Sequence, residues 1–405
     1  MKLTHLNRRT TLLGAIASLA APFPVFAQKR YGPGVSDTEI KIGSTMPFSG
    51  PVSILGTIGK STLAYFKKLN SEGGINGRQI KLIQYDDAFN PGKALEFTRR
   101  LVEQDEVSFV CETVGASSSN AVHRYLNGKK VPHLLIMSGS NKWTDAAAAP
   151  LTIPGMPSYF AEGRLYARWI LENMPSAKIA VLMENDDFGR DYLAGIKAGL
   201  GDKAKSMIVA ENTYEATDAS VDSQIVSLKA SNADVFIAVA NGKFAVQSMK
   251  KAHDIGWKPQ IILPIGSASV AAIMRPAGPE AGRGALSAIY NKPTTDPRFE
   301  KDPGVVQLRE FIAKWLPDAN PTDALVGAGY TAGHVLAHIV RSCGDDLTRE
   351  NIMRQANSLD KFTTPLLMPG IELSTSKDDH EIFSHLWVQR FDGNAWIPFG
   401  KAVAI

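Results

Sequence analysis

The sequence has few cysteines, which could form disulfide bonds or bind a metal, and it lacks long apolar runs after its N-terminal segment. Only Cys111 and Cys343 are present among 405 residues, which is too few for a cysteine-rich metal site. The two cysteines can pair in an oxidising compartment or remain as two buried free thiols, and both alternatives stay open. After residue 27 no apolar run is long enough to cross a bilayer, so the mature chain is expected to be soluble.

A net charge of one sign is also lacking once residues 1–27 are set aside. This segment has the features of a cleavable export signal, with Arg8 and Arg9 before the uncharged run 11–21 and the small residue Ala27 at its end. The arginine pair also resembles a twin-arginine signal, which a Sec signal can match by chance. Cleavage lowers the basic residues from 44 to 41 against 40 acidic residues. This balance argues against nucleic acid as a partner and, with the signal, predicts a periplasmic protein.

Enzyme motifs are missing or incomplete. The run 59–61, Gly-Lys-Ser, resembles the end of a phosphate-binding loop, but the first glycine of that motif falls on Ile54. No G-x-G-x-x-G follows the first predicted strand, and 115–119 lacks the closing glycine of a hydrolase nucleophile elbow. None of the eight histidines lies in a predicted ligand loop. We therefore expect no enzyme activity, no catalytic residues and no cofactor; an exported hydrolase remains the enzymatic alternative.

Two polar groupings admit a structural interpretation. His334 and His338 share a helix face, but apolar neighbours favour a packed helix over a metal site. The pairs 86–87 and 186–187, each Asp-Asp, follow predicted strands, where α/β proteins bind ligands. Adjacent carboxylates point in different directions, so neither pair is a ready acid/base couple, and we interpret Asp86 and Asp87 as solvated loop acids. No metal site is predicted.

Short β-type runs alternate with longer helical patterns along most of the chain. This alternation predicts an α/β fold with parallel sheets, and the length favours two lobes. The predicted strands are 39–43, 79–85, 107–111, 131–137, 178–183, 208–210, 234–240 and 260–263. The predicted helices are 56–70, 91–104, 119–127, 160–173, 192–200, 221–230, 245–255, 305–315 and 323–343. After residue 275 prolines predict an irregular connection, and 385–391 with 395–399 predicts a β-hairpin.

Several short motifs, each weak by itself, occur in order over residues 36–400. They are Ile42-Gly43, Met46-Pro47-Phe48-Ser49-Gly50-Pro51, Asn70-Ser71-Glu72-Gly73-Gly74-Ile75-Asn76-Gly77, Tyr85-Asp86-Asp87, Asn185-Asp186-Asp187-Phe188-Gly189 and Asp234-Val235-Phe236. In this order and spacing the chain resembles the branched-chain (leucine/isoleucine/valine-type) amino-acid periplasmic substrate-binding proteins of ABC transporters.

The resemblance implies a type I periplasmic-binding-protein fold. Two lobes, each with a mainly parallel sheet flanked by helices, would be joined by a hinge with three crossings. Lobe 1 would hold 28–156 and 289–379, and lobe 2 would hold 157–288 and 380–405. The family closes such a hinge over its ligand and delivers it to an inner-membrane ABC permease. A monomer is expected, and a periplasmic ligand sensor is an alternative role.

The resemblance also implies ligand-binding residues on loops that follow strand ends. The first-lobe loops place backbone N–H, hydroxyl and amide groups around a ligand carboxylate, which they can bind without a buried cation. These positions are Val114, Ala116, Ser117, Ser138, Ser140 and Asn141. The alternative is that they only form turns. The second lobe contributes Phe188 and Asn241, which would close over the ligand.

Two departures from the family pattern change the expected ligand. An aromatic residue after the first strand is replaced by Leu55, and the acidic partner of an amino-acid ammonium falls on Ile265. A buried ammonium without a carboxylate partner costs several kcal/mol. We therefore expect a small carboxylate with an apolar or aromatic body, with a branched-chain or other apolar amino acid as the alternative. Trp143, Tyr159 and Tyr330 are further candidates for contacts to that body; for Trp143 and Tyr159, packing at the hinge or rim is the alternative.

Overall fold

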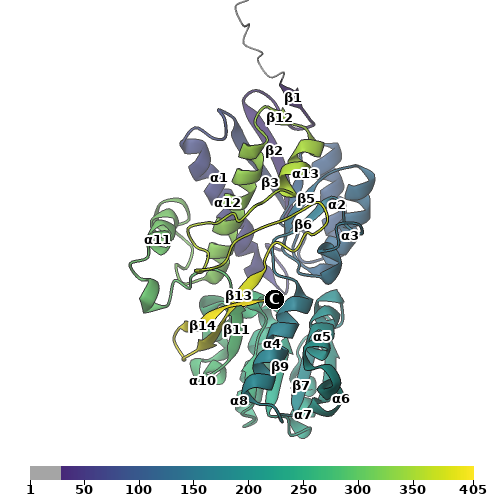
Figure 1. Cartoon of the computed structure of the whole chain (residues 1–405), viewed down its shortest axis with the longest axis vertical. Helices are drawn as coiled ribbons and strands as arrows, with labels where there is room; N and C mark the ends of the chain where they lie inside the picture. The colour runs from purple at the N-terminus through teal and green to yellow at the C-terminus, as the bar shows by residue number, and fades with distance from the viewer. Residues whose placement is uncertain (1–28) are drawn as a thin grey trace, which may run out of the picture.

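The strands form two large sheets and one small one. The computed structural model describes residues 29–405, so the expected signal peptide lies outside the described residues. The strand order is β3-β2-β4-β5-β6 in one large sheet and β14-β13-β11-β10-β9-β7-β8 in the other, while β1 pairs with β12. Figure 1 shows the two large sheets in two lobes stacked along the long axis of the molecule.

The first lobe contains an all-parallel five-stranded sheet. Its strands are β2 (Glu39–Met46), β3 (Gln79–Asp86), β4 (Val110–Cys111), β5 (His133–Ile136) and β6 (Thr152–Pro154). Its helices are α1 (Gly56–Ser71), α2 (Pro91–Glu103), α3 (Ala116–Gly128), α11 (Pro303–Trp315), α12 (Ala324–Ser342) and α13 (Arg349–Ala356), and the short pair is β1 (Arg30–Tyr31) with β12 (Asp346–Leu347). Parallel strands need helical crossovers, which α1, α2 and α3 supply between consecutive strands.

The second lobe contains a mixed seven-stranded sheet. The parallel strands are β7 (Ile179–Glu184), β8 (Ile208–Tyr214), β9 (Val235–Val239), β10 (Gln260–Ile262) and β11 (Leu286–Ile289), and the antiparallel hairpin is β13 (His385–Phe391) with β14 (Trp396–Ala404). The helices are α4 (Tyr159–Asn173), α5 (Asp187–Leu200), α6 (Ala204–Met207), α7 (Asp222–Ala230), α8 (Gly242–Asp254), α9 (Arg275–Ala277) and α10 (Pro279–Gly282). The α/β class expected from the alternation is confirmed.

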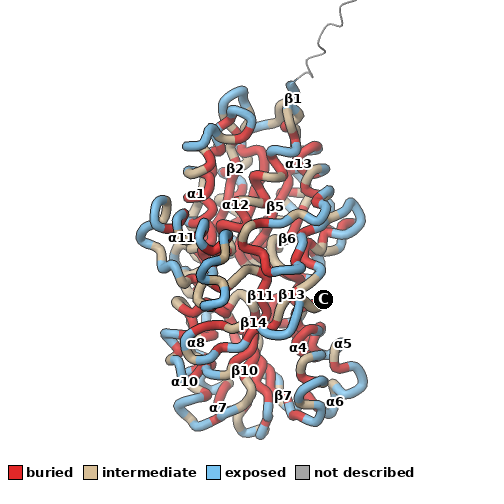
Figure 2. Tube along the Cα trace, turned by 60° about the vertical axis from the view of Figure 1, so that its left-hand side comes forward, coloured by how far each residue is buried: buried red, intermediate tan, exposed pale blue. Residues whose placement is uncertain are grey.

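The chain passes between the two large sheets three times. It does so between Pro154 and Tyr159, after Ile289 and before His385. Buried residues run through both lobes (Figure 2), and the largest buried cluster joins Phe66 of the first lobe with Ile237 of the second.

Two parts of the secondary structure differ from the sequence prediction. The helix expected over 192–200 begins five residues earlier, because the Asp186 carboxylate accepts hydrogen bonds from the N–H groups of Phe188 and Gly189 and caps α5. The connection expected to be irregular after residue 275 contains β11, whose four residues are all buried. A short apolar run without alternation carries little periodic signal, which is why this strand was not predicted.

Residues whose roles were open in the sequence lie in the core. Cys111 and Cys343 are both buried and unpaired. The His334 ring packs between Tyr65 and Tyr330, each with ring centroids 4.7 Å apart, as expected of a packed helix. The interpretation of Asp87 as a solvated acid is wrong, since its side chain is fully buried and accepts a hydrogen bond from the Phe89 N–H at 2.8 Å. Burial raises the pKa of Asp87 to about 6.

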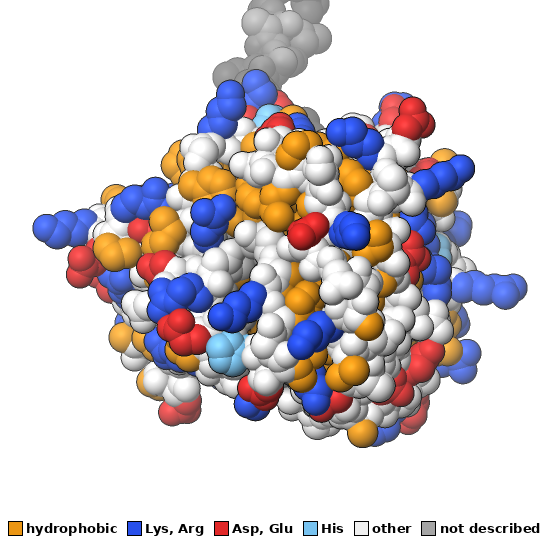
Figure 3. Space-filling view, turned by 90° about the horizontal axis from the view of Figure 1, so that it is seen from below, with side chains coloured by type: hydrophobic (Ala, Val, Ile, Leu, Met, Phe, Trp, Pro, Cys, Tyr) orange, Lys and Arg blue, Asp and Glu red, His pale blue; other side chains and the backbone are white. Residues whose placement is uncertain are grey.

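The outer surface carries both signs of charge. On the face seen from below, which belongs to the second lobe, Lys and Arg side chains are interspersed with Asp and Glu (Figure 3). Among residues 29–405, no helix combines the length and the apolar character that a membrane span requires.

Candidate functional site

A cavity lies between the lobes, and the empty space in it and at its open side amounts to about 1260 Å³. Residues that follow β4, β5, β9, β10 and β11 line it. These are Val114 and Gly115, Met137, Asn241, Pro264 to Gly266, and Tyr290 to Thr295. The carboxyl ends of parallel strands therefore point at the cavity from both sheets, which is where open α/β folds bind ligands.

Most of the cavity wall is apolar. Leu55 and Met137 come from the first lobe, and Ile265 comes from the second. An aromatic group from α4 and α5 forms one side: Phe188 lies edge-on to Tyr159 at 5.0 Å between ring centroids, and Tyr192 stacks on Tyr159 at 5.0 Å. Such a wall suits a ligand body that buries hydrocarbon or an aromatic ring.

The structure brings six of the eleven predicted ligand residues to this cavity. They are Leu55, Val114, Tyr159, Phe188, Asn241 and Ile265. The other five do not line it: Ala116, Ser117, Ser138, Ser140 and Asn141. Of the further aromatic candidates, Trp143 and Tyr330 are buried in the first lobe away from the cavity wall.

Three of the five remaining residues bond to acids of the other lobe. The Ser117 hydroxyl donates to Asp186 Oδ2 at 3.2 Å, the Ser140 hydroxyl donates to Asp191 Oδ2 at 2.7 Å, and the Asn141 N–H donates to the same oxygen at 2.8 Å. We call the three acids at the start of α5 (Asp186, Asp187 and Asp191) the acidic latch.

Asp187, the remaining acid of the acidic latch, also contacts the first lobe. Asp187 accepts from the Asn120 amide at 2.7 Å and pairs with Lys142 at 2.9 Å, both from the first lobe. Burial by itself would raise the pKa of Asp187. The hydrogen bonds from Lys142, Asn120 and Arg190, together with the charge of Lys142, outweigh burial and hold this pKa well below its usual range. The acidic latch therefore joins the two lobes. Its hydrogen bonds are strong because the acceptors are charged.

The other two residues are part of the first-lobe interior. Ser138 is fully buried, and its Oγ accepts the hydrogen bond of the Trp143 indole N–H at 3.2 Å. Ala116 is buried as the first residue of α3. The Ser117 and Ser140 hydroxyls and the Asn141 N–H, which were expected to bind a carboxylate, donate instead to the acidic latch.

The N-terminus of α3 begins beside the cavity, next to the lining residue Gly115. No side chain within residues 29–405 caps α3, which starts directly after Gly115 on the cavity wall. Its first N–H groups lack intrahelical acceptors and lie at the positive end of the helix dipole. Gly115 has a φ of 91°, and a Cβ at this position would lie 2.5 Å from the Phe89 ring. Only glycine therefore allows this backbone conformation in contact with Phe89.

Glu162 is a buried acid that the sequence analysis missed. The Ile265 N–H donates to Glu162 Oε1 at 2.8 Å, and the hydroxyls of Tyr166 and Tyr192 donate to the same carboxyl group. Burial raises the pKa of Glu162 to about 7. The carboxyl group lies behind the wall that Tyr192 and Ile265 form, and all of its donors come from the protein, so it supports the site without lining it. Only the fold brings it next to position 265.

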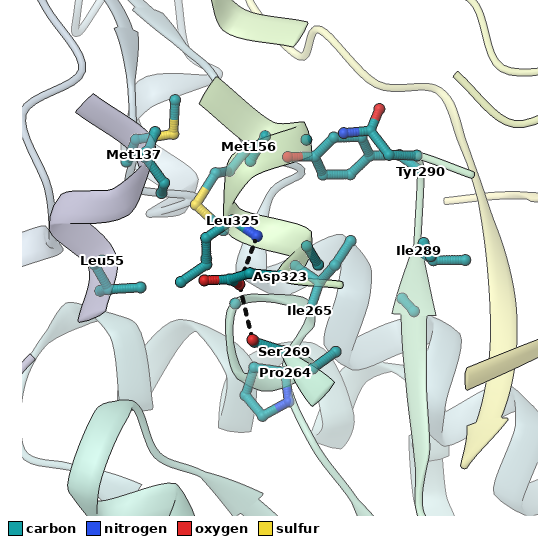
Figure 4. A pocket seen from close by; sticks show the side chains of 18 of the residues that line it. Leu55, Met137, Met156, Pro264, Ile265, Ser269, Ile289, Tyr290, Asp323 and Leu325 are labelled. Atoms are coloured by element: carbon teal, nitrogen blue, oxygen red, sulfur yellow. Dashed lines mark hydrogen bonds between the residues drawn. The ribbon is translucent and has the colours of Figure 1, made fainter. Parts of the chain in front are cut away.

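Asp323 is a second acid that was missed, and it does line the cavity. It precedes α12, and its Oδ1 accepts hydrogen bonds from the Ser269 hydroxyl at 2.8 Å and the Leu325 N–H at 3.0 Å. Figure 4 shows this arrangement, with the other carboxyl oxygen directed into the cavity. The predicted helix 323–343 begins at Asp323, but nothing in the sequence placed this residue in the cavity.

The comparisons with known proteins agree with this architecture. The Leu/Ile/Val-binding protein homolog 7 of Brucella suis is 23% identical over 276 residues, 64% of this chain and 66% of that protein, so the match spans just under two thirds of the relative. The Leu/Ile/Val-binding protein of Escherichia coli is 24% identical over 340 residues, 81% of this chain and 86% of the relative. A solute-binding protein of an ABC transporter from R. palustris, solved with benzoate, superposes with a TM-score of 0.75 at 21% identity over 91% of this chain and 98% of that one.

The family assignment rests on a match along nearly the whole described chain. The sequence profile of the periplasmic binding proteins matches residues 39–395, which include every strand of the five-stranded sheet and the helices of both lobes. The chain therefore belongs to the periplasmic binding protein family.

Proposed function

We propose that this protein is the substrate-binding component of an ABC uptake transporter and that its ligand is a small carboxylate with an apolar or aromatic body. The observation that carries the proposal is the interlobe cavity, whose mainly apolar wall adjoins the uncapped N-terminus of α3 at Gly115. The helix end would bind the carboxylate, while Leu55, Phe188 and Ile265 would contact the body.

Closure of the two lobes would enclose this ligand. The division into lobe 1 (28–156 and 289–379) and lobe 2 (157–288 and 380–405) places the three crossings between the lobes, where a hinge would bend. The acidic latch supports this proposal, because its hydrogen bonds join lobe 1 to lobe 2 and would form only when the lobes meet.

Export and delivery complete the proposed role. Residues 1–27 would act as a cleavable signal, of Sec or twin-arginine type, and bring the protein to the periplasm. There the monomer would pass its ligand to an inner-membrane permease. We propose no catalysis, since the described cavity wall holds neither histidine nor cysteine that could act as base or nucleophile.

A branched-chain or other apolar amino acid is the second candidate ligand. The names of the Escherichia coli and Brucella suis relatives favour it, as does Asp323, an acid on the cavity wall that could face an ammonium. Ile265 at the family's usual acidic position favours the simple carboxylate instead. A periplasmic ligand sensor would use the same site, and genes for a permease and an ATPase beside this one would favour transport.

The proposal is tested by calorimetric titration. The protein is first unfolded and refolded to remove any bound ligand. We expect benzoate or 3-phenylpropanoate to bind with a dissociation constant in the micromolar range or below, and to raise the melting temperature by mass action. Leucine and phenylalanine are the comparison ligands. Tight leucine binding without binding of either carboxylate would overturn the ligand class, and binding of none of the four would overturn the site.

A further inference from the structure

Asp323 differs from every other charged group at the cavity. Among the described residues that line the cavity, only Lys292 and Asp323 carry a charge. The Lys292 ammonium is paired with Asp302 at 2.8 Å and bonds to the Pro365 carbonyl at 3.1 Å, so its donors are engaged within the first lobe. Asp323 has no cationic partner among the described residues.

One oxygen of the Asp323 carboxylate is left for a ligand. Its side chain is only 8% exposed, and both protein hydrogen bonds end on Oδ1. Oδ2 has no hydrogen-bond partner within residues 29–405, and Figure 4 shows it directed into the cavity. Oδ2 is a charged acceptor with little access to water and no donor from the described residues, so a donor on the ligand would be favoured there.

The surroundings of this oxygen favour a neutral donor over an ammonium. The negative charge is already offset by two hydrogen bonds and by the positive end of α12, a helix of 19 residues. An ammonium presents three donors and needs an acceptor for each when it is buried. Leu325 and Ile265, which line the cavity near Asp323, offer apolar side chains, so a single donor matches the single free oxygen.

We propose that Asp323 selects ligands that carry a hydroxyl or N–H donor on the body, at a distance from the carboxylate. This inference rests on the proposed function and narrows its ligand class to hydroxylated or N–H-bearing aromatic and aliphatic carboxylates. The acid reaches the cavity from the first lobe and so does not replace the family's acid at Ile265 of the second lobe; it recognises a different group.

The test compares matched ligands on the wild-type protein and on D323S. The ligands are benzoate, phenylacetate and 3-phenylpropanoate, each unsubstituted, hydroxylated at the 3- or 4-position, or methoxylated there. Serine retains the N-cap of α12 but removes the carboxylate. We expect the best hydroxylated ligand to bind D323S about 10- to 100-fold more weakly than wild type, with unsubstituted ligands changed by less than about threefold.

A second variant reverses the hydrogen-bonding character of the position. In D323N the amide can cap the helix through its oxygen and present its NH₂ to the cavity, so the preference for hydroxyl over methoxy should fall about tenfold. T348S, at the N-cap of α13 and outside the residues that line the cavity, is the control for helix capping and should change neither preference.

The outcomes separate this inference from the proposed function. Carboxylate binding that D323S and D323N leave unchanged would overturn the role of Asp323 and leave the proposed function standing. A tighter affinity for phenylalanine than for any hydroxylated acid, lost in D323S, would identify an ammonium as the donor and overturn the neutral class. Absence of binding by all carboxylates to the wild-type protein would overturn both.

Discussion

Ser138 lies in the loop after β5, and its hydroxyl oxygen is the acceptor for the buried indole of Trp143. In S138A this indole N–H would lose its partner in an interior site, which costs about 1–3 kcal/mol. We expect the free energy of unfolding to fall by that amount in urea denaturation, while the affinity for a carboxylate ligand changes by less than about threefold.

A matched control for S138A is S248A. Ser248 is equally buried, but its hydroxyl donates to the Phe244 carbonyl within α8, and that carbonyl keeps its helical environment after the substitution. The loss of stability should be smaller there. A tenfold loss of affinity in S138A at unchanged stability would instead place Ser138 in contact with the ligand, as the family resemblance implies.

Single residues show where sequence reasoning about the site succeeds and where it stops. Leu55, Phe188 and Ile265 follow recognisable motifs, and the fold brings all three to the cavity. Glu162 and Asp323 lie more than 50 residues from Ile265 in the sequence, and only tertiary packing puts them near it. An N-capping Asp or a helical Glu can lie on the surface as well as in the interior. Residue type therefore did not indicate where Asp323 and Glu162 lie.

At the scale of elements, α5 holds the acidic latch at its first turns. In D191N the acceptor for Ser140 and Asn141 would lose its charge, which weakens two interlobe hydrogen bonds by about 1–2 kcal/mol in total. We expect ligand to bind about 5- to 30-fold more weakly because the closed form is less populated. Calorimetry measures the affinity, and small-angle X-ray scattering should show a larger radius of gyration for the unliganded variant.

D254N is the control for the acidic latch. Asp254 ends α8 and pairs with Lys250 on the exposed surface, so the same change of charge there should leave affinity and scattering as they are. If D191N also leaves both unchanged, the contacts of α5 with the first lobe do not stabilise closure.

Elements with clear periodicity or capping signals could be predicted, and those without could not. The predicted start at Pro91 is the start of α2, where the Asn90 side chain accepts a hydrogen bond from the Lys93 N–H and caps the helix. The start of α5 was placed at residue 192 because Asp186 was not recognised as the N-cap of a helix. β11 pairs with the preceding strand β10 and with β13 from near the C-terminus, and its own residues carry no periodic signal.

At the scale of the whole molecule, buried acids make stability depend on pH. Burial raises the pKa of Glu112 to about 8, and burial first, with help from Asp186, raises that of Glu184 to about 7; Glu162 is also near 7. Between pH 6.5 and 8 these acids ionise in the native state, whereas in the unfolded chain they are already ionised. The native state therefore binds more protons, and the free energy of unfolding falls as the pH rises.

The expected loss between pH 6.5 and 8 is on the order of 2 kcal/mol, measured by urea denaturation at each pH. Below pH 6.5 the buried His133 and His334, whose pKa values burial lowers to about 3 and about 4, oppose the trend because they accept protons more readily when unfolded. In E112Q, which mimics the protonated acid that faces Thr62, the slope above pH 7 should be shallower. A stability that rises from pH 6.5 to 8 would contradict the assignment.

The hydrogen bond between Ser269 of the second lobe and Asp323 of the first has a consequence for the proposed role in uptake. In an empty protein that closes, this bond and that of Leu325 satisfy only Oδ1, while Oδ2 loses part of its hydration and gains no donor from the described residues, which costs free energy. A ligand with a donor removes this cost, so loaded molecules close more readily than empty ones. The permease would then meet few empty closed proteins, and fewer cycles of ATP hydrolysis would be spent without cargo.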